Sequence, residues 1–184
     1  MAKVAARPLV TEKEFLRLPE SMTKIELVDG EVVVSPSPDY WHQEILLRIV
    51  AALRGWAARH KRPVTVAQSP LDVRFARGRI LQPDAFVLFA EIPASHHGPV
   101  DRVPELCVEV LSSDRVHDRV TKRLIYGMAG VKEYWVVEPA GVVERWSGSG
   151  LAESEELRER LTTPLLPGFR LDLRRLFATR RRRS

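Results

Sequence analysis

The stretch Leu106–Trp135 organises this chain and reads LCVEVLSSDRVHDRVTKRLIYGMAGVKEYW. An apolar run opens it and carries one carboxylate, Glu109, in its middle. A polar break follows, then a helix-like segment that contains Lys122, and a second strand-like run starts at Glu133. A buried acid followed by a lysine on the next helix is a pairing that chemistry uses and that packing alone does not require.

Length and composition indicate one globular domain with a hydrophobic core. The chain has 184 residues, of which 45% are hydrophobic and 29% charged. We assign residues 1–179 to this domain. No apolar run reaches the ~18 residues of a membrane span, and the N-terminus lacks the apolar stretch of a signal peptide. Cys107 is the only cysteine, which excludes an internal disulfide and is consistent with the cytoplasm, the expected location.

The net charge of +5 comes mainly from a basic C-terminal tail, residues 180–184, which contains Arg180 to Arg183. Without these four arginines, 25 of the 29 basic side chains remain against 24 acidic ones. A terminal basic run can contact phosphates, but a solvated end is the favoured interpretation. Overall charge therefore gives no argument for nucleic-acid binding.

The first half of the chain predicts a hairpin and a long helix. Asp29-Gly30 separates two β-forming runs, which is a hairpin signal. Ser37 is a candidate helix cap with Pro38 in the first helical position, and the helix is expected to reach about His60. Its apolar periodicity places His42 on the inward face, near the start of the helix.

The remaining patterns predict a sheet. The expected strands are Val64–Ala67, Leu71–Phe75, Ala85–Phe89, Leu106–Leu111, Tyr134–Val137 and Val142–Trp146. Glu153–Arg160 fits a strand or a helix, and Leu171–Phe177 is expected to be a short helix. The result is an α/β or α+β single domain, with one long helix before the central strands and one after them.

Asp84 and Glu109 are the acids that point to chemistry. Each lies at or inside an apolar strand-like run, where a carboxylate is costly unless it is paired, protonated or bound to a metal. Neighbouring strands would bring the two carboxylates together, and a divalent cation would remove their repulsion. Hard oxygen ligands suit Mg²⁺ or Mn²⁺. With a nearby lysine, these parts are suited to hydrolysing a phosphodiester.

An ordered set of motifs covers almost the whole chain, roughly Thr11 to Phe177. The motifs are ELVDGE from Glu26, SPSP with His42, PD at Asp84, EVLSSD from Glu109, Asp118 with Lys122 and Tyr126 at steps of four, GVKEYWVVEP from Gly130 and LLPGFRLDL from Leu165. This set resembles the Uma-two family of endonucleases, in the PD-(D/E)XK restriction-endonuclease-like superfamily. The resemblance implies a central mixed β-sheet flanked by helices.

The resemblance also implies roles for particular residues. Asp84 and Glu109 match the two metal-ligating acids. The usual lysine, two residues after the second acid, is replaced by Leu111, and the family's migrated lysine on the next helix matches Lys122. Glu26 matches an acid that completes the catalytic and metal site. His42 matches a recurring histidine, which we include among the catalytic candidates.

Each candidate also has a purely structural interpretation. Asp84 can simply begin a strand after Pro83, Glu26 can be an ordinary hairpin residue, and His42 can be a core or capping histidine. Asp118 and Lys122 can form a solvent-exposed helix pair worth about 0.3–0.5 kcal/mol. Glu109 is the residue for which a structural role is hardest to find.

Periodicity and resemblance disagree about the helix that carries Lys122. An apolar stripe of Val116, Val120, Leu124 and Met128 should face the core, which would leave Lys122 in water. The resemblance instead turns Lys122 toward the sheet. Both hold if the stripe is covered by a second subunit or another element, so we expect a homodimer or higher oligomer through Val120, Leu124 and Met128.

The leading functional hypothesis is a Mg²⁺- or Mn²⁺-dependent endonuclease acting on a nucleic acid, expected to be DNA. The alternative is a binding or assembly protein on the same fold that has lost catalysis, which the near-neutral body and Leu111 favour. Metal binding at the acids separates the two hypotheses.

Overall fold

The computed structural model describes residues 9–19, 23–112 and 117–179. The basic tail, residues 180–184, lies outside them, as does Val116. The helices are α1 (Glu12–Phe15), α2 (Tyr40–Ala57), the π-helical η1 (His117–Lys122), α3 (Arg123–Ala129), the 3₁₀ turn η2 (Ser149–Leu151) and α4 (Leu173–Leu176). The strands are β1 (Ile25–Val28), β2 (Glu31–Val34), β3 (Thr65–Gln68), β4 (Val73–Ala76), β5 (Arg79–Leu81), β6 (Ala85–Leu88), β7 (Leu106–Val110), β8 (Glu133–Glu138), β9 (Val142–Ser147), β10 (Glu153–Leu157), β11 (Arg160–Leu161) and β12 (Leu171–Asp172).

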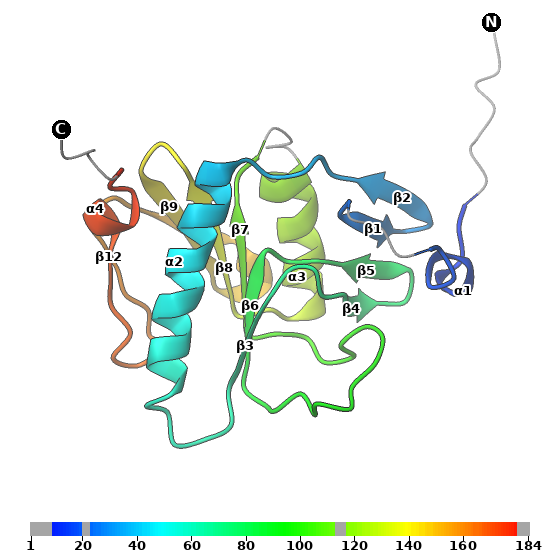
Figure 1. The fold of residues 1–184 in the computed structure, drawn as a ribbon, viewed down its shortest axis with the longest axis horizontal. Coiled ribbons are helices and arrows are strands. Elements are labelled where there is room, and N and C mark those ends of the chain that lie inside the picture. Colours follow the sequence, from blue (N-terminus) through cyan, green and yellow to red (C-terminus); the bar gives the residue numbers. More distant parts are fainter. Residues whose placement is uncertain (1–8, 20–22, 113–116, 180–184) are drawn as a thin grey trace, which may run out of the picture.

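A mixed sheet lies at the centre of the fold, in the strand order β10-β9-β8-β7-β6-β3 (Figure 1). Strands β7 and β8 run parallel, and the other neighbouring pairs in this sheet are antiparallel. The chain crosses from β7 to β8 through η1 and α3, because two parallel strands need a crossover connection. The predicted α+β architecture with a central mixed sheet is confirmed.

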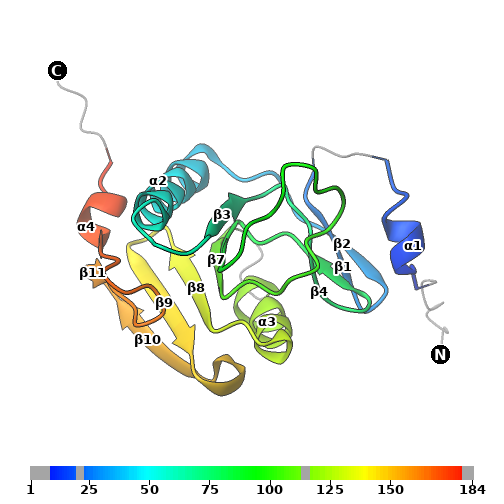
Figure 2. The same ribbon diagram turned by 90° about the horizontal axis from the view of Figure 1, so that it is seen from below.

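Alternate side chains of the central strands serve two separate cores. Val108 and Trp135 pack with the buried stripe of α2 on one face. Cys107 and Tyr134 point to the other face, where they pack with Tyr126 of α3. Figure 2 shows α2 and α3 on opposite sides of β7 and β8. This two-sided burial explains the nearly continuous apolar run of β7.

A smaller sheet, in the order β2-β1-β5-β4, lies beside the central one (Figure 1). Its β1–β2 hairpin turns at Asp29 and Gly30, whose φ angles are 50° and 91°. Two successive positive φ angles are typical of the tight hairpin turns that Asp-Gly favours, so the predicted hairpin is confirmed. The hairpin matters for the site because it positions Glu26.

The long helix α2 begins later and ends earlier than predicted. Asp39, not Ser37, is the N-cap, and its side chain accepts a hydrogen bond of 2.8 Å from the backbone N–H of His42. A carboxylate is a strong acceptor for a helix N-terminus, so Pro38 falls outside the helix. The helix ends at Ala57, three residues before His60.

Two C-terminal predictions are resolved or corrected. The acidic segment for which strand and helix were both open forms strand β10, paired with β9. The expected helix from Leu171 to Phe177 is shorter, because Leu171 and Asp172 pair with β11 and the helix covers only Leu173–Leu176. The Asp172 side chain caps it by accepting from the backbone N–H of Arg175.

The helical segment η1–α3 turns its charged face inward. Lys122 is 1% exposed, whereas Val120, Leu124 and Met128 are 47%, 50% and 74% exposed. The prediction from periodicity, that this apolar stripe faces the core, is therefore wrong, and the orientation implied by the resemblance is confirmed. Within the described residues no other element covers the stripe, so its burial by a second subunit remains a prediction.

None of the helices in the described part of the chain has the combined length and hydrophobicity that crossing a membrane requires.

Candidate active site

Asp84 and Glu109 meet because their strands are neighbours. Strands β6 and β7 are antiparallel, with Ala85 opposite Val108, so Asp84 immediately before β6 lies opposite Glu109. Both acids line a cleft of about 830 Å³. The register of β6 and β7 therefore places the two acids next to each other, as predicted.

Asp84 is held by donors on both carboxylate oxygens. Lys24 Nζ lies 3.0 Å from Oδ1, and the backbone N–H of Val110 donates to Oδ2 over 2.9 Å. His42 Nε2 lies 3.1 Å from the same Oδ2. Burial alone would raise the pKa of this carboxyl, but the Lys24 ammonium and the His42 ring lower it well below its usual range. Asp84 is therefore a fixed carboxylate.

Glu109 is buried more completely than Asp84, with 1% of its surface exposed against 7%. The Tyr126 hydroxyl donates to Oε1 over 2.9 Å. Oε2 accepts from two ammonium groups, Lys122 at 3.0 Å and Lys24 at 3.3 Å. Burial raises the pKa of this carboxyl to about 7, against the opposing effect of the two lysines.

Lys122 is enclosed by carboxylates from three elements. Its Nζ lies 3.0 Å from Glu109, 3.2 Å from Asp118 and 3.5 Å from Glu26. Burial would lower the pKa of this lysine, but the three acids raise it well above its ordinary value. The interpretation of Asp118 and Lys122 as a solvent-exposed pair is wrong, because long-range acids draw both side chains inward.

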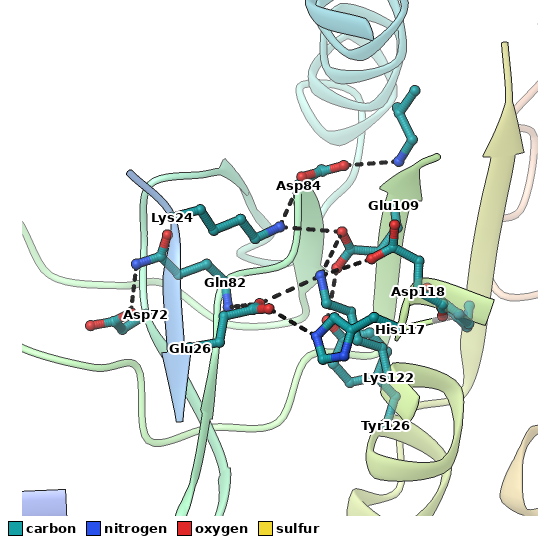
Figure 3. A network of polar contacts seen from close by, with 12 residues as sticks. Lys24, Glu26, Asp72, Gln82, Asp84, Glu109, His117, Asp118, Lys122 and Tyr126 are labelled. Carbon is teal, nitrogen blue, oxygen red and sulfur yellow. Dashed lines mark hydrogen bonds and ion pairs between the residues drawn. The ribbon is translucent and has the colours of Figure 1, made fainter. Parts of the chain in front are cut away.

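Glu26 is fully buried on β1, in the small sheet. Its Oε1 accepts a hydrogen bond of 2.8 Å from the backbone N–H of Gln82, and His117 Nε2 lies 3.2 Å from Oε2. Burial raises the pKa of this carboxyl, but Lys122, His117, Lys24 and the Gln82 N–H together lower it to about 2. Glu26 thus faces the site from the far side of the Lys122 ammonium, as Figure 3 shows.

The cluster has more negative than positive charge. Four carboxylates, those of Glu26, Asp84, Glu109 and Asp118, surround the ammonium groups of Lys24 and Lys122. If all four acids are ionised and both histidines are neutral, two negative charges are unbalanced. The raised pKa of Glu109, about 7, and the raised pKa of His42 mean that protons offset part of this charge when no cation is bound. One divalent cation would neutralise the cluster.

Asp84 and Glu109 fit such a cation by their donor chemistry. Two adjacent carboxylates with room for water resemble the sites that Mg²⁺ uses, where one or two carboxylates combine with water and substrate phosphates. Among the described residues, no group of three or more His, Cys, Asp and Glu side chains is arranged to hold a metal. The Lys24 ammonium bridges the two carboxylates, which shows that these oxygens attract a positive charge.

Sequence reasoning missed two residues of the cluster, Lys24 and His117. Lys24 stands two positions before Glu26, and side chains alternate along a strand, so the pair should share a face. That spacing could have identified Lys24. His117 directly precedes Asp118 on a helix-like segment, and nothing in its local pattern distinguishes it.

The fold and the cluster together define an α+β protein in which acids and lysines gather where the interior strands β6 and β7 of the central sheet meet the small sheet. Residues 12–174 match the family model of Uma2, described as "Putative restriction endonuclease". The chain therefore belongs to the Uma2 family, which confirms the resemblance seen in the motifs.

A solved structure gives the same picture of the fold. The chain is similar to a "putative nuclease belonging to DUF820" from Anabaena variabilis ATCC 29413, with 23% sequence identity and a TM-score of 0.75. The similarity covers 91% of this chain and 97% of the other. No curated protein matches this chain. At the level of the family, the comparisons support a nuclease.

Proposed function

We propose that this protein is a metal-dependent endonuclease that hydrolyses phosphodiester bonds of a nucleic acid, with DNA as the expected substrate. The observation that carries the proposal is the gathering of four buried carboxylates around only two ammonium groups, at the place where Asp84 and Glu109 meet. Burying four carboxylates with only two ammonium groups is costly, and packing gives no reason for it. Binding of a divalent cation together with a substrate phosphate would give a reason for this arrangement of carboxylates.

In this proposal Asp84 and Glu109 hold the cation. The Val110 N–H and His42 fix one oxygen of Asp84, and the Tyr126 hydroxyl fixes one oxygen of Glu109. Groups of this kind set the orientation of ligating carboxylates. Mg²⁺ or Mn²⁺, when bound, would supply an activated water and stabilise the charge that develops on the phosphate.

Lys122 serves this site by favouring the ionised form of Glu109, because its ammonium lowers the Glu109 pKa against the effect of burial. Its ammonium lies 3.0 Å from Glu109, on the helix that follows β7, which is the position implied by the migrated lysine. Leu111, at the usual lysine position, is instead buried in the core that includes Tyr126. Glu26, predicted as a further ligand, is engaged by Lys122, His117 and the Gln82 backbone. We therefore assign Glu26 to balancing the Lys122 charge.

The test is cleavage of plasmid DNA and oligonucleotides with Mg²⁺ or Mn²⁺, comparing wild type, Glu109→Gln and Glu133→Gln. Each substitution replaces one buried carboxylate with an amide of nearly the same size. Glu133 is 4% exposed and bonds to Trp135, Arg145 and Thr163, away from the cleft. We expect Glu109→Gln to lower the rate by at least about a hundredfold, the scale of losing one catalytic group.

Glu133→Gln should retain cleavage if it remains folded, which thermal unfolding would establish. Equal cleavage by all three proteins would show that the activity does not arise at this site. Absence of cleavage in wild type on single- and double-stranded DNA and RNA, together with absence of Mn²⁺ binding, would favour the non-catalytic alternative.

A further inference from the structure

Lys24 occupies the position between Asp84 and Glu109 that the proposed cation would take. Its Nζ lies 3.0 Å from Asp84 Oδ1 and 3.3 Å from Glu109 Oε2. It reaches these acids from the small sheet, where its backbone carbonyl accepts from the N–H of Ser35 over 2.9 Å. Figure 3 shows Lys24 and Lys122 approaching Glu109 from different sides.

The two lysines of the cluster differ in how firmly they are held. Lys122 contacts three carboxylates and is 1% exposed. Lys24 contacts two carboxylates, and its side chain is 16% exposed at the cleft. An ammonium on a flexible four-carbon stem can move a few ångströms without moving the backbone. Lys24 is therefore the lysine that can leave.

A divalent cation would compete with the Lys24 ammonium for Asp84 Oδ1 and Glu109 Oε2. Both are positive, so the repulsion between them would weaken the binding of each when the other is present. Displacement would move the Lys24 ammonium toward the open part of the cleft. A substrate phosphate bound to the cation would lie there too.

We propose that Lys24 is an internal counter-ion that joins Asp84 and Glu109 in the metal-free protein, gives up this place to the divalent cation, and then contacts the substrate phosphate. This inference rests on the proposed metal-dependent function. It assigns to Lys24, rather than to the enclosed Lys122, the contact with substrate.

The first test measures Mn²⁺ affinity by titration calorimetry for wild type, Lys24→Met and Lys132→Met. Lys132 is exposed, so its substitution makes the same change in net charge away from the cleft. We expect Lys24→Met to bind Mn²⁺ at least about tenfold more tightly than Lys132→Met, because a competing charge is removed from the site itself. Lys24→Arg, which keeps the charge, should bind no more tightly than wild type.

Tighter metal binding should accompany slower cleavage. At saturating Mn²⁺, Lys24→Met should have a kcat/KM at least about tenfold below that of Lys132→Met, since the phosphate loses a charged contact. If Lys24 only held the two acids in place, its loss would loosen Asp84 and Glu109, and Lys24→Met would bind Mn²⁺ more weakly than Lys132→Met.

A second measurement uses the wild-type chain, so it does not depend on whether a variant folds. Acylation of lysines is followed by mass spectrometry with and without saturating Mn²⁺. The rate at Lys24 should rise several-fold with Mn²⁺, while the rate at Lys132 stays constant.

The outcomes separate the two proposals. Equal or weaker Mn²⁺ binding by Lys24→Met, or an unchanged acylation rate at Lys24, would overturn the exchange while leaving the metal site intact. Failure of wild type, Lys24→Met and Lys132→Met alike to bind Mn²⁺ would overturn the metal site and the exchange with it.

Discussion

Replacing Lys122 with Met tests whether this lysine balances the buried acids. The substitution keeps much of the side-chain volume but removes the ammonium from between Glu26, Glu109 and Asp118. Removing one partner of a buried ion pair costs about 3–5 kcal/mol, because the remaining charge is left uncompensated. A domain of this size loses roughly 2–4 °C of melting temperature per kcal/mol, so Lys122→Met should melt roughly 6–20 °C lower.

The assay is urea unfolding in EDTA, followed by the fluorescence of the buried Trp135 and Trp56. Lys132→Met is the control and should change the free energy of unfolding by less than about 0.5 kcal/mol. Adding Glu109→Gln to Lys122→Met should recover part of the loss, because neighbouring charges are coupled. A Lys122→Met protein as stable as wild type would refute the reasoning.

The defect of Lys122→Met should also depend on pH. Without the ammonium, the nearby acids have a higher pKa in the folded than in the unfolded state. A raised acid pKa leaves stability intact below the unfolded pKa and lowers it as pH rises. The difference from wild type should therefore be larger at pH 8 than at pH 5, and a difference that grows toward acid pH would contradict this explanation.

Three further predictions follow from particular contacts. Tyr126→Phe removes the donor to Glu109 Oε1 and should cost about 1–3 kcal/mol in urea unfolding; unchanged stability would mean that the bond contributes nothing. Gly127→Ala places a methyl group against the backbone oxygen of Gly150, closer than van der Waals contact allows, and should cost about 1–3 kcal/mol by the same assay despite the better helix propensity of Ala. Stabilisation would show that the structure shifts easily to accept the methyl group. The exposed apolar stripe predicts a dimer or larger assembly in light scattering that Leu124→Asp converts to a monomer; a monomeric wild type would contradict it.

Local sequence signals were sufficient wherever the deciding contacts are local. Asp29-Gly30 predicts its hairpin because the turn needs two positive φ angles. Asp84 and Glu109 could be singled out from sequence because each lies at or inside a buried strand, but that their strands are neighbours is known only from the structure.

The helix that carries Lys122 could not be oriented from its own periodicity. Three apolar residues mark one face, yet the opposite face is buried, because Lys122 pairs with Glu109 and Glu26 from two different sheets. Those partners are 13 and 96 positions away in the chain. Hydrophobic periodicity contains no information about such pairs. The ordered family motifs do, because they match Lys122 to a lysine of the site.

The position of Lys24 depends on how the two sheets meet. Its acids lie 60 and 85 positions later in the chain, and the small sheet must fold back onto β6 and β7 to bring them together. Alternation along the strand could place Lys24 on the face of Glu26, but it could not identify what that face meets.

The most direct test of the proposed metal site is a crystal structure grown or soaked with Mn²⁺, with anomalous scattering recorded. We predict an anomalous peak between the carboxylates of Asp84 and Glu109, with the Lys24 ammonium moved off both. A peak bound by other residues, or none between these acids at saturating Mn²⁺, would contradict the assignment.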